Sequence, residues 1–229
     1  MSAVGTQHTA PALPTAVLFD LDGTLSDSEP FVAVALQRTL QAFGYHVTKE
    51  RVIEELGPPL QPMLETLAQT RFDPAQLDAM RDEYLRHYNA TLAQIEPLPG
   101  AVALLDALRA RGVPIALVTN KREDGAHEQL AALGWTERFA TVIGADTAGA
   151  PKPDAAPARE ALRRLGAAAA NAAFVGDMEP DMECASAAGL PWRIGYTRAR
   201  TPDALRNAGA THLCAHLNEV AAVLLGNVP

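Results

Sequence analysis

The sequence predicts an α/β protein: a doubly wound parallel sheet that carries a small, all-helical domain inserted after its first strand. Three observations lead to this fold class. Short apolar runs end in polar or glycine-containing turns, which is typical of strands buried on both faces. Helical patterns separate most of these runs, as in βαβ units. A long stretch between the first two runs shows helical periodicity and no convincing strand.

Five short runs are predicted to form the strands of the sheet. They are mainly apolar, and four residues suffice for a strand in a small sheet. They span residues 16–19, 115–118, 141–144, 173–176 and 192–195.

Two helical patterns are clearest among the segments that connect these strands. Pro99-Gly100 opens the first pattern, and Gly112 can end it. The second runs over about residues 154–165, with Gly166 as its stop. The apolar face predicted for the first helix consists of Val102, Leu104, Leu105 and Leu108.

The insertion lies between residues 28 and 96 and is expected to be a helical cap domain. Its apolar residues recur at helical spacing, and Pro58-Pro59 and Phe72-Asp73-Pro74 interrupt the pattern. Pro97-Leu98-Pro99-Gly100 marks the return to the sheet. The expected division is a flexible N-terminal tail (1–13), a helical cap (28–96) and an α/β core (14–27 and 97–229).

Composition narrows the classes of function. The 229 residues are 48% hydrophobic and 20% charged, which is ordinary for a globular protein. A formal net charge of −8 argues against a nucleic-acid partner. No apolar run is long enough for a bilayer, and no signal peptide opens the chain, so we expect a cytoplasmic protein without a membrane partner. Cys184 and Cys214 cannot form a disulfide framework and are expected to be small apolar fillers.

Polar residues follow the predicted strands at their carboxyl ends, where ligands bind in open parallel sheets. Carboxylates, a hydroxyl and an ammonium are thereby expected to meet at one edge. The candidate residues are Asp20 and Asp22 after the first strand, Thr119 and Asn120 after the second, Lys152 between the third and fourth, and Asp177 and Asp181 after the fourth.

These residue types fit metal-dependent phosphoryl transfer. One carboxylate can attack phosphorus, and a second can protonate the leaving oxygen and later deprotonate water. Carboxylates gathered together repel one another, so a hard divalent cation with oxygen ligands is expected among them. Lys152 would offset remaining charge, and Thr119 with backbone N–H groups would bind phosphate oxygens.

A simpler interpretation remains for each candidate. The aspartates could cap helices or close turns, Thr119 could be an ordinary strand-end residue, and Lys152 could be solvated. Lys121 and Arg122 are expected to be surface charges.

Four ordered motifs resemble those of the haloacid dehalogenase superfamily. They are Asp20-Leu21-Asp22-Gly23-Thr24-Leu25, Val118-Thr119-Asn120, Pro151-Lys152-Pro153 and Gly176-Asp177-Met178-Glu179-Pro180-Asp181. Together with Asp27-Ser28-Glu29-Pro30, they resemble the phosphoglycolate phosphatase-like branch, which has a Rossmann-like core and a helical cap after the first strand.

The resemblance implies a role for each matching residue. Asp20 matches the nucleophile and Asp22 the general acid/base. Thr119, Asn120 and Lys152 match the groups that bind phosphate, and Thr119 and Lys152 also serve catalysis. The implied Mg²⁺ is held by the side chains matching Asp20 and Asp177, by the backbone carbonyl matching Asp22, and by Asp181 directly or through water.

The expected function is therefore a Mg²⁺-dependent phosphatase of small phosphomonoesters that acts through an aspartyl phosphate, with phosphoglycolate as the first substrate to test. Its partner is a small phosphorylated metabolite, and the sequence carries no signal of oligomeric state. One alternative is a sugar phosphomutase of the β-phosphoglucomutase type. Another is a non-catalytic protein that binds phosphorylated metabolites. A dehalogenase is disfavoured because it does not need an acid/base such as Asp22.

Overall fold

A computed structural model describes residues 13–226. Its centre is a six-stranded, fully parallel sheet in the order β3-β2-β1-β4-β5-β6. The first strand therefore lies in the middle, and the chain winds outward from it first to one side and then to the other. The strands are β1 (Ala16–Phe19), β2 (Ile115–Val118), β3 (Thr141–Ile143), β4 (Ala172–Gly176), β5 (Trp192–Tyr196) and β6 (His212–Cys214).

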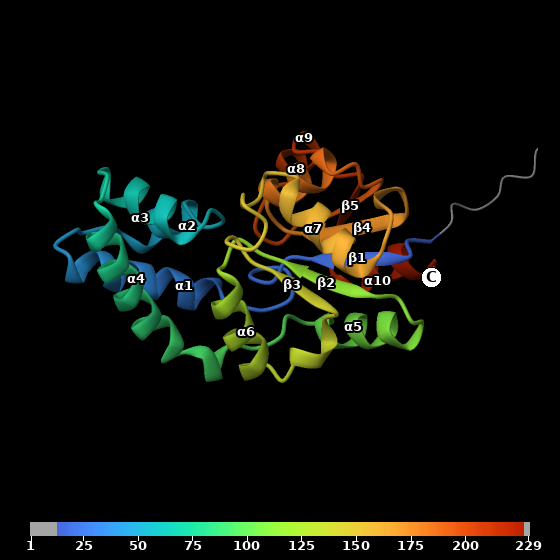
Figure 1. Ribbon diagram of the computed structural model, residues 1–229, viewed down its shortest axis with the longest axis horizontal. Coiled ribbons are helices and arrows are strands. Elements are labelled where there is room, and N and C mark those ends of the chain that lie inside the picture. The colour runs from blue at the N-terminus through green and yellow to red at the C-terminus, as the bar shows by residue number, and fades with distance from the viewer. Residues whose placement is uncertain (1–12, 227–229) are drawn as a thin grey trace, which may run out of the picture.

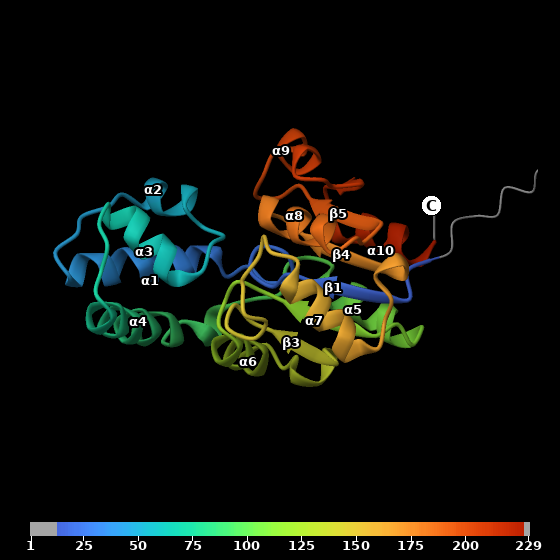
Figure 2. The ribbon, with the colours of Figure 1, turned by 45° about the horizontal axis from the view of Figure 1, so that its top comes forward.

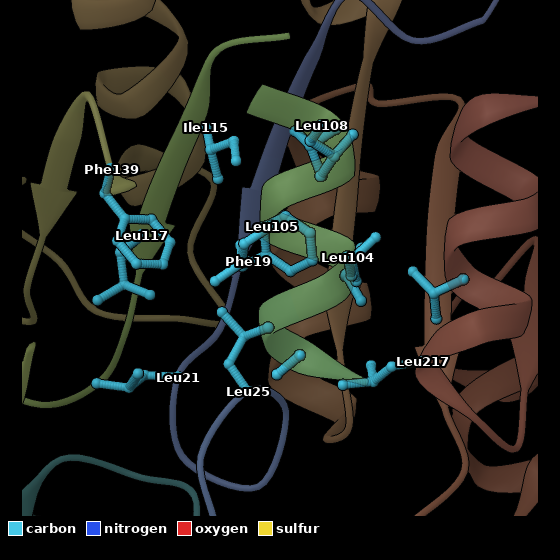
Figure 3. Close-up of a cluster of buried hydrophobic side chains, with 14 of the residues drawn as sticks. Phe19, Leu21, Leu25, Leu104, Leu105, Leu108, Ile115, Leu117, Phe139 and Leu217 are labelled. Atoms are coloured by element: carbon cyan, nitrogen blue, oxygen red, sulfur yellow. The ribbon is translucent and has the colours of Figure 1, made fainter. Parts of the chain in front are cut away.

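Helices cover both faces of the sheet, as Figures 1 and 2 show. On one face, side chains of α5, α6 and α10 pack against β1 and β2, with Phe19 and Leu105 among the buried residues (Figure 3). On the other face, α7 and α8 pack on side chains such as Leu18 and Phe174. The core helices are α5 (Ala101–Ala110), α6 (Glu123–Ala132), α7 (Ala156–Leu165), α8 (Glu179–Ala187), α9 (Pro202–Asn207) and α10 (Leu217–Leu225), with the 3₁₀ turns η2 (Thr136–Arg138) and η3 (Ala169–Asn171).

The helical insertion follows β1 and has a hydrophobic cluster of its own, which includes Leu36, Leu64 and Met80. Its helices lie together beside the carboxyl ends of the strands (Figures 1 and 2). A capping box at Asp73 and Gln76 starts its longest helix. The insertion contains α1 (Glu29–Ala42), α2 (Lys49–Glu54), α3 (Leu60–Ala68), α4 (Pro74–Asn89) and η1 (Leu92–Gln94).

The predicted fold class is confirmed, including the parallel sheet and the helical insertion after β1. The short strand β6 was not predicted, because three residues with an exposed edge carry little apolar signal. Val102 was wrongly placed on the buried face of α5: it is 37% exposed, whereas Leu104, Leu105 and Leu108 are buried. Residues 1–12 of the expected tail lie outside the described residues.

Within residues 13–226, no helix combines the length and the apolar character that a membrane span requires.

Two glycines, one within α6 and one after β3 that lies against the first residue of α6, lead to opposite predictions about stability. A Cβ on Gly144, just after β3, would collide with the backbone N and Cα of Glu123, whereas a Cβ on Gly125 would meet Lys121 Cγ at an ordinary 3.5 Å. We expect Gly144→Ala to lower the free energy of unfolding by about 1–3 kcal/mol. Gly125→Ala should be neutral or raise it by roughly 0.5–1 kcal/mol, because helical glycine is entropically costly. Urea denaturation measures both, and an unfolding midpoint of Gly144→Ala at or above that of the parent would contradict the packing.

Candidate active site

The predicted site residues meet at the carboxyl edge of the sheet, in a pocket between the core and the insertion. The central position of β1 brings this about, because β2 and β4 flank it and end beside it. The N–H of Asp20 continues the ladder by donating to the Val175 carbonyl at 3.0 Å. The site residues lie in the segments that follow the carboxyl ends of the strands, with Asp181 in the first turn of α8, so the parallel topology gathers them.

Lys152 lies buried between two carboxylates. Its ammonium donates to Asp20 Oδ1 and to Asp181 Oδ1, both at 2.7 Å, and all three side chains are at most 8% exposed. Burial alone would lower the pKa of Lys152, but the charges of Asp181 and Asp20 outweigh it and hold that pKa above its ordinary value. Lys152 is therefore held as a cation here, and the simpler interpretation of a solvated lysine is wrong.

Asp177 completes a cluster of three buried carboxylates with Asp20 and Asp181. Ligand oxygens of the three lie within 4.8 Å of one another. Thr24 Oγ1 donates to Asp177 Oδ1 at 2.5 Å, whereas Asp177 Oδ2 is buried and has no hydrogen-bond partner within residues 13–226. Burial, and then the charges of Asp20 and Asp181, raise the pKa of Asp177 well above its usual range.

A divalent cation fits this cluster. Burial raises the pKa of Asp20 to about 7, and Lys152 offsets this only in part. Among the described residues, one ammonium thus accompanies three carboxylates, and Asp177 Oδ2 has no hydrogen-bond partner. Gly23 lies beside that oxygen: its φ is +81°, and a Cβ at this position would lie only 2.5 Å from Asp177 Oδ2, so no side chain fits there. Hard oxygen ligands of this kind are those that Mg²⁺ binds.

The carboxylate of Asp22 belongs to a different network. Its Oδ1 accepts from Ser28 Oγ and from Gln129 Nε2 at 3.1 Å, and its Oδ2 accepts from Lys121 Nζ at 3.1 Å. Burial on its own would raise the pKa of Asp22, but the Lys121 charge and these hydrogen bonds outweigh it and lower that pKa. Only the backbone carbonyl of Asp22 remains for the metal ligand set that the family resemblance implies.

Lys121 is not the surface charge that its sequence neighbours indicated. Its side chain is 12% exposed, it pairs with Asp22, and its Nζ lies 4.2 Å from the ring centre of Tyr88. Arg122, by contrast, is 52% exposed and pairs with Asp146. A single sequence cannot separate two adjacent basic residues of which one points inward.

Thr119 and Asn120 follow β2 and face the same pocket. Thr119 is 2% exposed, and its Oγ1 accepts from the N–H of Lys121 at 3.1 Å. The side-chain amide of Asn120 is occupied: it accepts from the Lys152 N–H at 2.9 Å and donates to the carbonyls of Lys152 and Gly57. Asn120 therefore links the backbone of Lys152 to Gly57 of the insertion. The backbone of Asn120 is then the part of this residue that can face a phosphate.

Four functional neighbours were missed at the sequence level: Thr24, Ser28, Tyr88 and Gln129. Thr24 and Ser28 lie within motifs that the sequence marked, so their hydroxyls could have been proposed. Tyr88 and Gln129 lie in α4 and α6, outside any motif, and carry no local signal. Cys184 and Cys214 are buried among apolar side chains, as expected of fillers.

Comparisons with known proteins agree with this geometry. The family of haloacid dehalogenase-like hydrolases matches residues 17–193. The chain is 36% identical to a phosphoglycolate phosphatase of Rhodospirillum rubrum over 198 residues, which cover 81% of this chain and 82% of that one. It is 37% identical to a phosphoglycolate phosphatase of Xanthomonas campestris pv. campestris over 180 residues, or 78% and 81% of the two chains.

Among solved structures, the chain resembles a hydrolase from Pseudomonas syringae with a TM-score of 0.79 and 25% identity, covering 90% of this chain and 98% of that one. The sheet order, the insertion after the first strand and the buried aspartate cluster occur together with a family match over most of the chain. The chain is an enzyme and belongs to the haloacid dehalogenase-like hydrolases.

Proposed function

We propose that this hydrolase is a Mg²⁺-dependent phosphatase that cleaves small phosphomonoesters through an aspartyl phosphate. The observation that carries the proposal is the buried Lys152, which contacts Asp20 and Asp181 at 2.7 Å each beside the bare oxygen of Asp177. This arrangement leaves excess negative charge for a cation and supplies one fixed positive charge for a phosphate. The phosphoglycolate phosphatases among its relatives make phosphoglycolate the first substrate to test.

Asp20 is the proposed nucleophile. Its carboxylate attacks phosphorus, a bond forms between the Asp20 oxygen and phosphorus, and the bond from phosphorus to the ester oxygen breaks. The hydrogen bond from Lys152 to Asp20 Oδ1 orients the carboxylate, so one oxygen is held while the other is left to attack. Water then cleaves the aspartyl phosphate, which releases phosphate and restores Asp20.

Asp22 is the proposed general acid/base. In the first step it gives a proton to the leaving ester oxygen, and in the second it takes a proton from the attacking water. Its low pKa favours the ionised form that the second step needs. A phosphate dianion bound beside it raises that pKa, which favours the protonated form for the first step.

Asp20, Asp177 and Asp181, with the backbone carbonyl of Asp22, would hold Mg²⁺. When bound, the ion neutralises carboxylate and phosphate charge as a Lewis acid. Thr119 Oγ, Lys152 Nζ and the backbone N–H of Asn120 are the proposed donors to phosphate oxygens, and each follows a strand end at the same edge.

A phosphomutase would use the same residues, so the alternative differs only in the acceptor of the phosphoryl group. The relatives that are phosphoglycolate phosphatases favour water as that acceptor. Analysis of products from a hexose 1-phosphate would identify a mutase. A non-catalytic binding protein is disfavoured, because three buried carboxylates are costly to keep without a task.

We further propose that residues 28–96 act as a cap that selects the substrate. Its face of the pocket is largely apolar, with Leu56, Pro58, Pro59, Leu60 and Met63 among the lining residues. Every group proposed to contact the metal, the phosphate or the reacting oxygens lies outside this segment. A cap that closes would exclude water in the first step and must admit it for the second.

Replacing the nucleophile should abolish turnover. Asp20→Asn keeps the shape of the side chain and can still accept from Lys152, but its amide cannot attack phosphorus. Phosphate release from p-nitrophenyl phosphate measures the effect, with circular dichroism as the control for folding. Activity within about tenfold of the parent, a difference of only about 1.4 kcal/mol in the barrier, would show that the nucleophile is misassigned.

Removing the cation should abolish activity and lower stability. Chelation should stop phosphate release, and Mg²⁺ should restore it and raise Tm, because binding to the folded state relieves carboxylate repulsion. Asp177→Asn should lose both the activity and the Mg²⁺-dependent rise in Tm. Asp154→Asn, which alters an exposed loop carboxylate, is the matched control and should keep both. Full activity after exhaustive chelation would exclude the proposed metal.

Cap variants should change specificity and spare the chemistry. Leu60→Ala and Met63→Ala alter the apolar wall of the pocket, so they should change the ratios of kcat/KM among phosphomonoesters by roughly tenfold. Asp22→Asn should instead lower kcat/KM for every substrate whose leaving group needs a proton. If the cap variants scale all substrates by one common factor, the insertion does not select substrate.

A further inference from the structure

We propose that Tyr88 on the helical insertion and Gln129 on the core are positioning residues that hold Asp22 in the orientation for general-acid catalysis. The inference rests on the proposed function of Asp22 and goes beyond it, because it names the groups that aim this carboxylate. Neither residue belongs to the four motifs, and neither carries a local signal in the sequence.

Asp22 Oδ1 is saturated with donors. Ser28 Oγ, Lys121 Nζ at 3.3 Å and Gln129 Nε2 at 3.1 Å all donate to it. Asp22 Oδ2 has a single partner, Lys121 Nζ at 3.1 Å. The donors therefore fix the orientation of the carboxylate mainly through Oδ1 and leave Oδ2 as its less engaged oxygen.

Tyr88 contacts two of the groups that donate to Asp22, namely Gln129 and Lys121. Its hydroxyl donates to Gln129 Oε1 at 2.7 Å and accepts from Lys121 Nζ at 2.9 Å. Because the Gln129 carbonyl is engaged by Tyr88, its amide nitrogen must face Asp22 and Ser26 Oγ, which lies 2.9 Å away. Burial raises the pKa of Tyr88, so this phenol remains a donor. Tyr88 is 2% exposed and Gln129 is fully buried.

This network lies where the insertion joins the core. Ser28 is the N-cap residue of α1, yet its hydroxyl makes no capping bond and donates to Asp22 instead. Tyr88 lies in the last turn of α4, the longest helix of the insertion. Both ends of the insertion therefore contact the surroundings of Asp22, and the position of the insertion determines the orientation of this carboxylate.

The inference predicts a loss that depends on the leaving group. A nitrophenolate ion departs without a proton, whereas a phenolate without the nitro group is more basic and benefits from protonation by Asp22. kcat/KM covers the steps up to departure of the leaving group, so it isolates general-acid catalysis from the later attack of water. If Tyr88 and Gln129 had only a structural role, replacing them would lower kcat/KM for both substrates by the same factor.

The test compares p-nitrophenyl phosphate with phenyl phosphate, using the Mg²⁺-loaded full-length chain. Tyr88→Phe removes one hydroxyl but keeps the ring that stacks on Tyr84 at 5.7 Å and lies against Lys121 at 4.2 Å. Gln129→Met removes both polar atoms at similar volume. Each variant should lower kcat/KM for phenyl phosphate roughly tenfold more than for p-nitrophenyl phosphate, a part of the 10²–10⁴-fold that a general acid contributes.

Asn89→Ala is the matched control. Asn89 neighbours Tyr88 on α4 and donates to Glu128 Oε2 on α6 at 2.9 Å, so it joins the insertion to the core without touching Asp22. It should change kcat/KM for both esters by one common factor. The double variant Tyr88→Phe/Gln129→Met should lose less than the product of the two single losses, because both residues act on one carboxylate.

The outcomes separate the two proposals. The positioning role is supported if the Tyr88 and Gln129 variants lose more kcat/KM with phenyl phosphate than with p-nitrophenyl phosphate, and Asn89→Ala does not. Equal losses with both esters, or no loss, would overturn it while the phosphatase activity of the parent stands. A parent that releases no phosphate from either ester would overturn the proposed function itself. Thermal unfolding of each variant distinguishes loss of the fold from loss of the positioning of Asp22, and Tyr88→Phe carries the test by itself if Gln129→Met is unstable.

Discussion

The buried ammonium of Lys152 is the interaction on which the rest of the site depends. Three charged side chains leave water together, and the attraction between them offsets that cost only because the contacts to Asp20 and Asp181 are short and direct. Asp20 follows β1, Lys152 lies between β3 and α7, and Asp181 lies in the first turn of α8, so the two salt bridges of one ammonium tie together segments that are far apart in the chain. It also leaves a negative excess, because Asp177 adds a third carboxylate without a second cation from the protein. The proposed need for a metal follows from this imbalance of charge.

A tight turn after β1 places Asp20 and Asp22, which are two residues apart, in different surroundings. Gly23, with a φ of +81°, lets the chain reverse, and its N–H donates to the Ser26 carbonyl at 3.0 Å. Asp20 consequently faces Lys152 and the carboxylate cluster, whereas the side chain of Asp22 faces Lys121 and Gln129. These surroundings move the two pKa values in opposite directions, raised for Asp20 and lowered for Asp22. Divergent environments of this kind suit a nucleophile and an acid/base in one reaction.

The helical insertion contributes both a wall and an anchor. Its apolar loop forms one side of the pocket, and the carbonyl of Gly57 in that loop accepts from Asn120, which in turn holds the backbone of Lys152. At its other end, Tyr88 reaches the residues around Asp22. The insertion thus contacts the surroundings of both catalytic carboxylates through the core residues that hold them. Its own hydrophobic cluster, separate from those of the sheet, allows it to keep its shape while its contacts with the core change.

The sequence by itself determined the elements and the main site residues, because their signals are local. Apolar runs define buried strands, and parallel strands bring the loops at their carboxyl ends to one edge, so the sequence alone could place Asp20, Thr119, Lys152 and Asp177 together. Only the tertiary structure decided which basic residue faces inward. Lys121 and Arg122 are adjacent and alike in sequence, yet one is 12% and the other 52% exposed, because Tyr88 and Asp22 approach from distant segments. Gln129 could not be identified from the sequence for the same reason, because its partners lie 41 and 107 residues away. The role of a polar residue on a buried helix face depends on the groups that packing brings against it.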